Sequence, residues 1–184
     1  MASWPDVLYP GGVMSIEFDQ EGPGFDDPLV MLHACHERVR HFAGLGLKLS
    51  AHLAAHGNDA MAREAAGKIL RYFSVAAPLH HQDEEEDLFP ALLDAAPEEL
   101  RMQIRRLEAE HADLAVLWRR MRTALEQVVT GAAVLDEELA REFSERYPRH
   151  ADDEEQLIYP HASRLLDRTI LHEMGARMAA RRKY

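Results

Sequence analysis

The stretch that decides the fold runs from Pro97 to Gly131 and reads PEELRMQIRRLEAEHADLAVLWRRMRTALEQVVTG. Alternating steps of four and three residues pick out one set of its side chains: Leu100, Ile104, Leu107, His111, Leu114, Trp118, Met121, Leu125 and Val128. This spacing forms a stripe along one side of a helix, which is typical of a helix packed in a bundle. The two glutamates after Pro97 suit a helix N-terminus, and Gly131 marks the end of the segment.

Three further segments have the same rhythm, over about residues 28–55, 58–94 and 134–166. The stripe of the last one consists of Leu135, Leu139, Phe143, Tyr147, His150, Glu154 and Leu157. Asp27-Pro28 reads as an N-cap followed by Pro at the first helical position. Because no alternating strand pattern competes and the connections are short, the sequence predicts an all-α, up-down-up-down four-helix bundle.

The two ends of the chain have a different character. We expect residues 1–26 to form an irregular N-terminal arm rich in Pro and Gly, 27–166 to form the bundle, and 167–184 to form a short C-terminal helix with a basic tail. Ile170, Leu171, Met174 and Met178 fall on one side of that last helix, which indicates that it docks. We expect its Arg-Arg-Lys-Tyr end to be solvated.

Composition excludes several classes of protein. The 184 residues are enough for a single core, and a net charge of −11 argues against a nucleic-acid partner. No apolar run approaches the ~20 residues that cross a bilayer, and the first residues lack the pattern of a secretory signal. One cysteine rules out an internal disulfide and fits a reducing compartment. We therefore expect a cytoplasmic protein without a membrane partner, and its oligomeric state stays open.

Ionisable residues interrupt each apolar stripe near its middle. They are His36 in the first segment, His80 and Glu84 in the second, His111 in the third, and His150 and Glu154 in the fourth. A His four residues before a Glu puts both side chains on one helix face, and an inward carboxylate without a partner is costly. A single inward His is usually a satisfied core residue. Four His and two Glu on four stripes instead predict a bound cation, which takes imidazoles and carboxylates as ligands.

The second and fourth segments also repeat each other at an offset of 70 residues. PLHHQDEEEDLFP at 78–90 aligns with PRHADDEEQLIYP at 148–160, and six of the thirteen positions are identical. The chain thus reads as two helical hairpins, each with one lone His and one His-x-x-x-Glu pair. If the hairpins pack as a pseudo-two-fold pair, we expect them to hold two metal ions bridged by Glu84 and Glu154. Pro78 and Pro148 each precede a motif His by two residues. They leave two interpretations open, a bend that aims the His inward or a break in the helix.

This doubled H-x-x-x-E-E-x-x-[LI]-[FY]-P pattern, with a His upstream of each copy, resembles the hemerythrin-like HHE cation-binding family over about residues 28–166. The resemblance implies a four-helix bundle around a non-haem di-iron centre with an oxo or hydroxo bridge. It implies metal ligation by His36, His80, Glu84, His111, His150 and Glu154.

The chain departs from the oxygen-carrying hemerythrins at two places. Those proteins have a second His four residues after the lone His of the third helix, where this chain has Ala115. His81 could supply the missing ligand, with an outer or surface role as the alternative, and His33 is a weaker candidate. Their fourth helix uses Asp at the position of Glu155, whereas here the nearer Glu154 fits. Fewer protein ligands leave open coordination positions for water, dioxygen, nitric oxide or peroxide.

Several functions remain open at this point. One is a protein that holds iron or that binds or senses small oxidants such as O₂ or NO. The alternative is a di-iron enzyme that acts on peroxide or NO, or in repair of iron–sulfur damage; the family's repair proteins carry an N-terminal cysteine, which residues 1–26 lack. A structural bundle with an incidental metal is a third reading. A ferritin-like oxidase would need Glu-x-x-His pairs on two helices, and only Glu108-x-x-His111 fits. Six or seven N/O ligands suit two iron ions, with Mn or Zn as the other metals.

The remaining acidic and aromatic residues of the motifs receive plainer interpretations. A mostly solvated face is expected for Glu85, Glu86, Asp87, Asp152 and Asp153, although Glu85 or Asp83 could orient a ligand His. Phe89 and Tyr159 are interpreted as core aromatics at the end of the site. Cys35 is interpreted as a small buried or partly buried residue.

Overall fold

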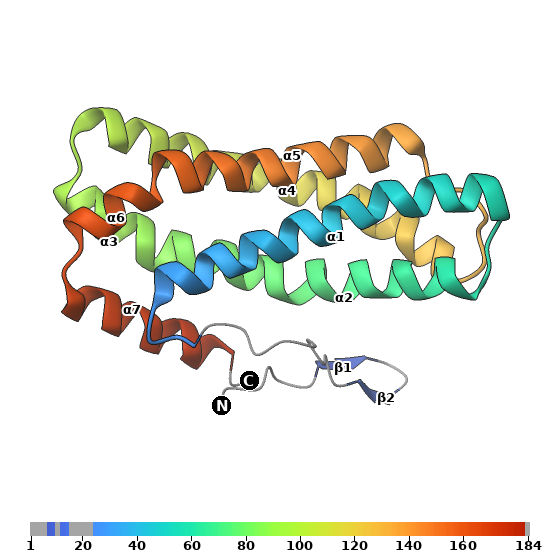
Figure 1. The fold of residues 1–184 in the computed structure, drawn as a ribbon, viewed down its shortest axis with the longest axis horizontal. Coiled ribbons are helices and arrows are strands. Elements are labelled where there is room, and N and C mark those ends of the chain that lie inside the picture. The colour runs from blue at the N-terminus through green and yellow to red at the C-terminus, as the bar shows by residue number, and fades with distance from the viewer. Residues whose placement is uncertain (1–6, 10–11, 15–23, 183–184) are drawn as a thin grey trace.

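The computed structural model describes residues 7–9, 12–14 and 24–182. Its long helices are α1 (Pro28–His56), α2 (Ala60–Asp83), α4 (Glu98–Val129) and α5 (Glu137–Leu157). α1 packs against α2 and α5, and α4 packs against the same two helices. Successive long helices run in opposite directions (Figure 1). The predicted all-α four-helix bundle is confirmed.

Local signals in the sequence set the helix ends. Asp27, Asp59 and Asp136 each precede a long helix and accept a hydrogen bond from the backbone N–H three residues later, at 3.2, 2.8 and 2.7 Å. Such caps satisfy donors that have no partner within the helix. Gly57 and Gly131 follow α1 and α4 with φ of 74° and 119°, which only glycine adopts without strain.

Each helix that carries a copy of the motif continues past a local irregularity. After α2 the chain forms one π-helical turn, η1 (Glu84–Leu88), and then α3 (Phe89–Ala95). After α5, Ile158 interrupts the helix and α6 (Tyr159–Leu165) begins. Pro78 and Pro148 lie inside α2 and α5, so the interpretation that they break the helices is wrong.

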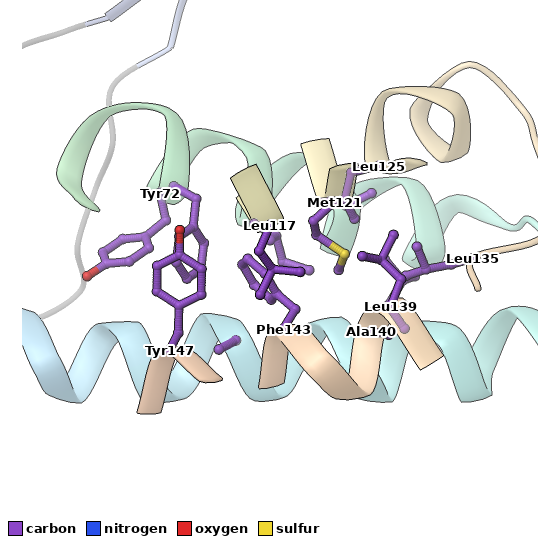
Figure 2. Close-up of a cluster of buried hydrophobic side chains, with 14 of the residues drawn as sticks. Tyr72, Leu117, Met121, Leu125, Leu135, Leu139, Ala140, Phe143 and Tyr147 are labelled. Atoms are coloured by element: carbon purple, nitrogen blue, oxygen red, sulfur yellow. The ribbon is translucent and has the colours of Figure 1, made fainter. Parts of the chain in front are cut away.

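Apolar side chains form two clusters, one on each side of the polar layer. Figure 2 shows the first, in which Leu117 and Phe143 meet between the helices. The second gathers side chains from the opposite ends of the helices and from α7 (Arg168–Arg181). On α4, His111 separates Leu107 of the second cluster from Leu114 of the first. The ionisable residues are therefore held between two apolar layers, where water is scarce.

The predicted stripes are correct except at two positions. Leu117 is buried where Trp118 was expected, and Trp118 packs against the cluster while partly exposed. Leu157 is 36% exposed, and Ile158 is buried in its place. Ile158 follows Glu154 by four residues and Leu157 follows it by three, so both positions are compatible with the stripe, and packing buries Ile158.

α7 docks against the beginning of α1, at the end of the bundle that holds α3 and α6 (Figure 1). Met174 and Met178 are buried as predicted, and a Cβ at Gly175 would lie 2.0 Å from the carbonyl oxygen of Phe25, so glycine is required for this close approach. The expectation of a solvated basic end is wrong for Arg182, which is buried. Residues 183–184 lie outside the described residues.

The N-terminal arm is described only in part. β1 (Val7–Tyr9) pairs antiparallel with β2 (Gly12–Met14), a short ladder that the expectation of an irregular arm did not include. Residues 1–6, 10–11 and 15–23 of the arm lie outside the described residues. Among the helices that the structure describes, none combines the length and apolar character needed to cross a membrane.

Candidate metal centre

The seven candidate ligands converge at the middle of the bundle in two groups. His36, His80, Glu84 and Glu154 form the mixed group, and all four are buried. The histidine group consists of His81, His111 and His150. Within each group the potential ligand atoms lie within 4.8 Å of one another, and no further group of this kind occurs among the described residues. His33 joins neither group; it is exposed, with Nδ1 3.3 Å from Oε1 of Glu155.

The two carboxylates connect the two groups. Oε2 of Glu84 lies 3.7 Å from Nε2 of His80 in the mixed group and 3.7 Å from Nε2 of His111 in the histidine group. The Glu154 carboxylate lies 3.1 Å from Nε2 of His36, 3.4 Å from Nε2 of His111 and 3.0 Å from Nε2 of His150. Each carboxylate therefore touches imidazoles of both groups, which is the arrangement that two bridged cations need.

Several of the converging atoms are buried without a hydrogen bond. Oε2 of Glu84, Oε2 of Glu154 and Nε2 of His150 have no hydrogen-bond partner among the described residues. Each buried polar atom without a hydrogen bond lowers the free energy of unfolding by about 1–3 kcal/mol. Cations at the convergence point would satisfy all three atoms, so the residues present fit a metal site.

Outer carboxylates orient three of the imidazoles. Nδ1 of His36 lies 2.9 Å from Oε1 of Glu155, and Nδ1 of His111 lies 2.6 Å from Oε1 of Glu85. A proton on Nδ1 shared with a carboxylate leaves Nε2 free for a metal. The prediction that Glu85 orients a ligand His is confirmed. Glu155 was missed in this role, although it occupies the same position of the repeat as Glu85.

A third outer carboxylate had no signal in the sequence. Oε2 of Glu110 lies 3.1 Å from Nδ1 of His150, yet Glu110 belongs to neither motif. The suggestion that Asp83 orients a ligand His is not borne out, because this buried carboxylate pairs with Arg181 and Arg182. Asp87 is also buried and pairs with arginines of α7, so its assignment to a solvated face was wrong.

Burial controls the protonation of the imidazoles. Burial lowers the pKa of His80 well below its usual value, and the charge of His36 adds to this effect. Burial lowers the pKa of His81 in the same way, with His111 as the next cause. Both rings are therefore neutral, which is the form that binds metals. Burial also opposes protonation of His36 and His150, but neighbouring carboxylates outweigh it and raise the pKa of each.

The pKa values of the two central carboxyl groups are shifted in opposite directions. Burial, followed by the charge of Glu154, raises the pKa of Glu84 well above its usual value. Burial acts in the same direction on Glu154, but the charge of His150 and the contacts of the surrounding imidazoles hold its pKa well below the usual value.

An aromatic ring from the end of each motif lies against the centre. The hydroxyl of Tyr159 donates to Oε1 of Glu84 at 2.8 Å and lies 3.3 Å from Nε2 of His36. Burial, followed by the charges of Glu84 and Glu154, raises the pKa of Tyr159 well above its usual value, so the phenol keeps its proton. Phe89 stacks on the ring of His111 with centroids 6.0 Å apart. The interpretation of both rings as core aromatics holds for Phe89 and misses the polar contacts of Tyr159.

The model of the hemerythrin HHE cation-binding domain matches residues 27–162. This chain belongs to the hemerythrin HHE cation-binding family. An uncharacterized protein of Haemophilus influenzae is 36% identical over 171 residues, which are 92% of this chain and 98% of that protein. The resemblance inferred from the doubled motif is thereby confirmed. Family membership and the buried His and Glu groups together fit a metal-cation site in this HHE domain.

Proposed function

We propose that this HHE domain holds two iron ions with an exogenous oxo or hydroxo bridge, and that the pair binds or senses a small ligand such as O₂, NO or peroxide. The observation that carries the proposal is that Glu84 and Glu154 each contact imidazoles of both groups. Five imidazoles and two carboxylates would share the ligation. The donors are nitrogen and oxygen, which suits two six-coordinate ions better than one tetrahedral zinc, although Mn shares the preference for oxygen.

The number of donors differs between the two groups. An ion in the mixed group would have two imidazoles, an ion in the histidine group would have three, and both would share the carboxylates. With one exogenous bridge between the ions, the mixed group would offer one protein donor fewer than the histidine group and could leave a position for a small ligand. Because the mixed group is fully buried, that position suits a diatomic or triatomic ligand. Iron there would supply reversible binding or redox chemistry toward the ligand.

The lone cysteine supports the proposed surroundings of the protein. Cys35 is buried and unpaired, and burial raises its pKa to about 12. A thiol in this state is neither a metal ligand nor a disulfide partner. We propose that the protein is cytoplasmic, since a chain with one cysteine fits a reducing compartment.

Metal analysis of the whole chain tests the proposal. Protein loaded anaerobically with ferrous iron and then oxidised should contain about two irons per chain and absorb in the near ultraviolet as oxo-bridged ferric ions do. Glu154→Ala and Glu84→Ala should each lose this absorption, because each removes one bridge. Glu145→Gln, an exposed change on the same helix as Glu154, serves as the control and should leave both readouts unchanged.

Two results would overturn the di-iron proposal. One is a single tetrahedral zinc bound in preference to iron, and the other is unchanged absorption in both bridge variants. Titration of the loaded protein then separates binding from catalysis. A stoichiometric, reversible spectral change with O₂ or NO favours a binding protein, whereas repeated turnover of peroxide favours the enzyme alternative.

A further inference from the structure

Tyr159, the first residue of α6, contacts two of the four donors of the mixed group. Its hydroxyl donates to Oε1 of Glu84 at 2.8 Å and lies 3.3 Å from Nε2 of His36. Its ring stacks on that of His36 with an interplanar angle of 7°. Since Tyr159 is buried, the ring and hydroxyl have little freedom to turn elsewhere.

The corresponding position of the first motif holds Phe89, 70 residues earlier. Phe89 lies against His111, the lone His of the second hairpin, whereas Tyr159 lies against His36, the lone His of the first. The two aromatic residues are thus related by the same pseudo-two-fold pairing as the ligands. They differ by a single hydroxyl group, and that hydroxyl is on the side of the mixed group.

Cation binding changes which partners this hydroxyl can have. Once Nε2 of His36 donates its lone pair to a metal, it can no longer accept a hydrogen bond. The proton of Tyr159 is then left with an oxygen of Glu84 or with a ligand held on the side of the mixed group. Buried hydroxyl groups rarely remain without a partner, and a phenol donates strongly to an anionic acceptor.

We infer that Tyr159 is the hydrogen-bond donor to the small ligand held on the side of the mixed group. The inference rests on the proposed pair of metal ions. It assigns Phe89 the role of a purely apolar wall on the opposite side.

Azide binding to the oxidised, iron-loaded protein tests the inference, with Tyr159→Phe as the test variant and Tyr147→Phe as the control. Tyr159→Phe should keep two irons and their bridge absorption but weaken azide binding roughly tenfold, as expected for a lost hydrogen bond to a charged acceptor. Tyr147→Phe removes a buried hydroxyl that donates to the backbone carbonyl of Leu114, away from the centre, and should leave azide affinity unchanged. In the wild type, the vibrations of bound azide should shift between H₂O and D₂O, and this shift should be absent in Tyr159→Phe.

The outcomes separate this inference from the proposed function. If the wild type binds two irons and Tyr159→Phe binds azide with the same affinity as the wild type, the role of Tyr159 is overturned and the proposed function stands. Loss of iron from Tyr159→Phe would also overturn it, because Tyr159 would then hold Glu84 in place and would not serve the ligand. A wild-type isotope shift of zero would contradict the hydrogen bond without any variant. Failure of the wild type to take up an iron pair would instead overturn the proposed function.

Discussion

Residues 78–90 and 148–160 each present one His-x-x-x-Glu pair to the centre, and the first copy adds His81, but different neighbours hold the two copies in place. In the first copy Asp83 is completely buried and receives Arg182 at 2.5 Å and Arg181 at 3.0 Å from the end of α7. In the second copy the matching Asp153 is partly exposed and pairs with Arg106 of α4 at 2.9 Å. The repeat therefore specifies the ligands, whereas elements outside the repeat determine how firmly each copy is held.

The imidazoles of the two copies are also oriented differently. His150 has Glu110 at Nδ1, whereas Nδ1 of His80 has no hydrogen-bond partner among the described residues. The residue before each lone His also differs. It is Glu110 before His111 and Cys35 before His36, and a thiol cannot replace a carboxylate as a strong acceptor. The centre is therefore asymmetric both in His81, which has no counterpart in the second copy, and in the groups behind the shared candidate ligands.

The largest expected effect that tests this difference between the two copies is a loss of folding stability. Arg182→Met removes one of the two arginines from the buried carboxylate of Asp83. Burial raises the pKa of Asp83 even though both arginines lower it, so the charge depends on its partners. Breaking a buried ion pair lowers the free energy of unfolding by about 3–5 kcal/mol. Because Arg181 still pairs with Asp83 in this variant, we expect a loss near the lower end of that range.

The matched change in the other copy is Arg106→Met. This arginine and Asp153 are both partly exposed, and an exposed pair contributes about 0.2–1 kcal/mol. Urea denaturation of both metal-free variants measures the difference. Equal losses would mean that α7 does not distinguish the two copies.

A smaller effect is expected on iron affinity when the outer carboxylates are neutralised. Glu85 and Glu155 occupy the same position of the repeat, and each reaches the lone His of the other hairpin. Removal of such an outer partner lowers metal affinity about 10–100-fold. Glu85→Gln and Glu155→Gln should therefore have losses of similar size in competition with a coloured ferrous chelator, and Glu145→Gln should have none. A loss in only one of the two variants would contradict the crosswise symmetry.

The sequence was sufficient to bring the candidate ligands together because their signals are periodic. The heptad-like stripes predict which faces turn inward, and the offset of 70 residues predicts that His80, Glu84, His150 and Glu154 meet. His81 required a further inference from the missing ligand at Ala115, and the structure places it beside His111 and His150.

Other features could not be predicted because nothing periodic marks them. Asp83 and Arg182 are 99 residues apart, and charge alone does not reveal which acid a distant arginine will reach. Glu110 points at His150 from the neighbouring helix, so its role depends on the packing of α4 against α5. The hydroxyl of Tyr159 enters the centre just after Ile158 interrupts the helix; Pro160 indicates a break there, but a proline does not predict where the neighbouring side chain will point.

The smallest expected effect compares the helices on which the two copies are built. Asp59 caps α2 and Asp136 caps α5, but Asp59 also lies 3.0 Å from Nε2 of His52. The N–H of Ala62, followed by His52, lowers the pKa of Asp59 below its ordinary 3.8. Because the pKa is lower in the folded state, this stabilisation is complete above the ordinary value and is lost as pH falls through the folded-state pKa.

Asp59→Ala should therefore lower the melting temperature by a few degrees at pH 7, and this difference should shrink as the pH falls below 3.8. His52→Ala should also reduce stability at pH 7, but it should add little in the Asp59→Ala background, because the two side chains share one contact. Asp136→Ala provides the cap without a histidine partner. Additive effects of His52→Ala and Asp59→Ala would show that α2 and α5 are capped alike, and the comparison of the two copies would then depend on α7 and the outer carboxylates alone.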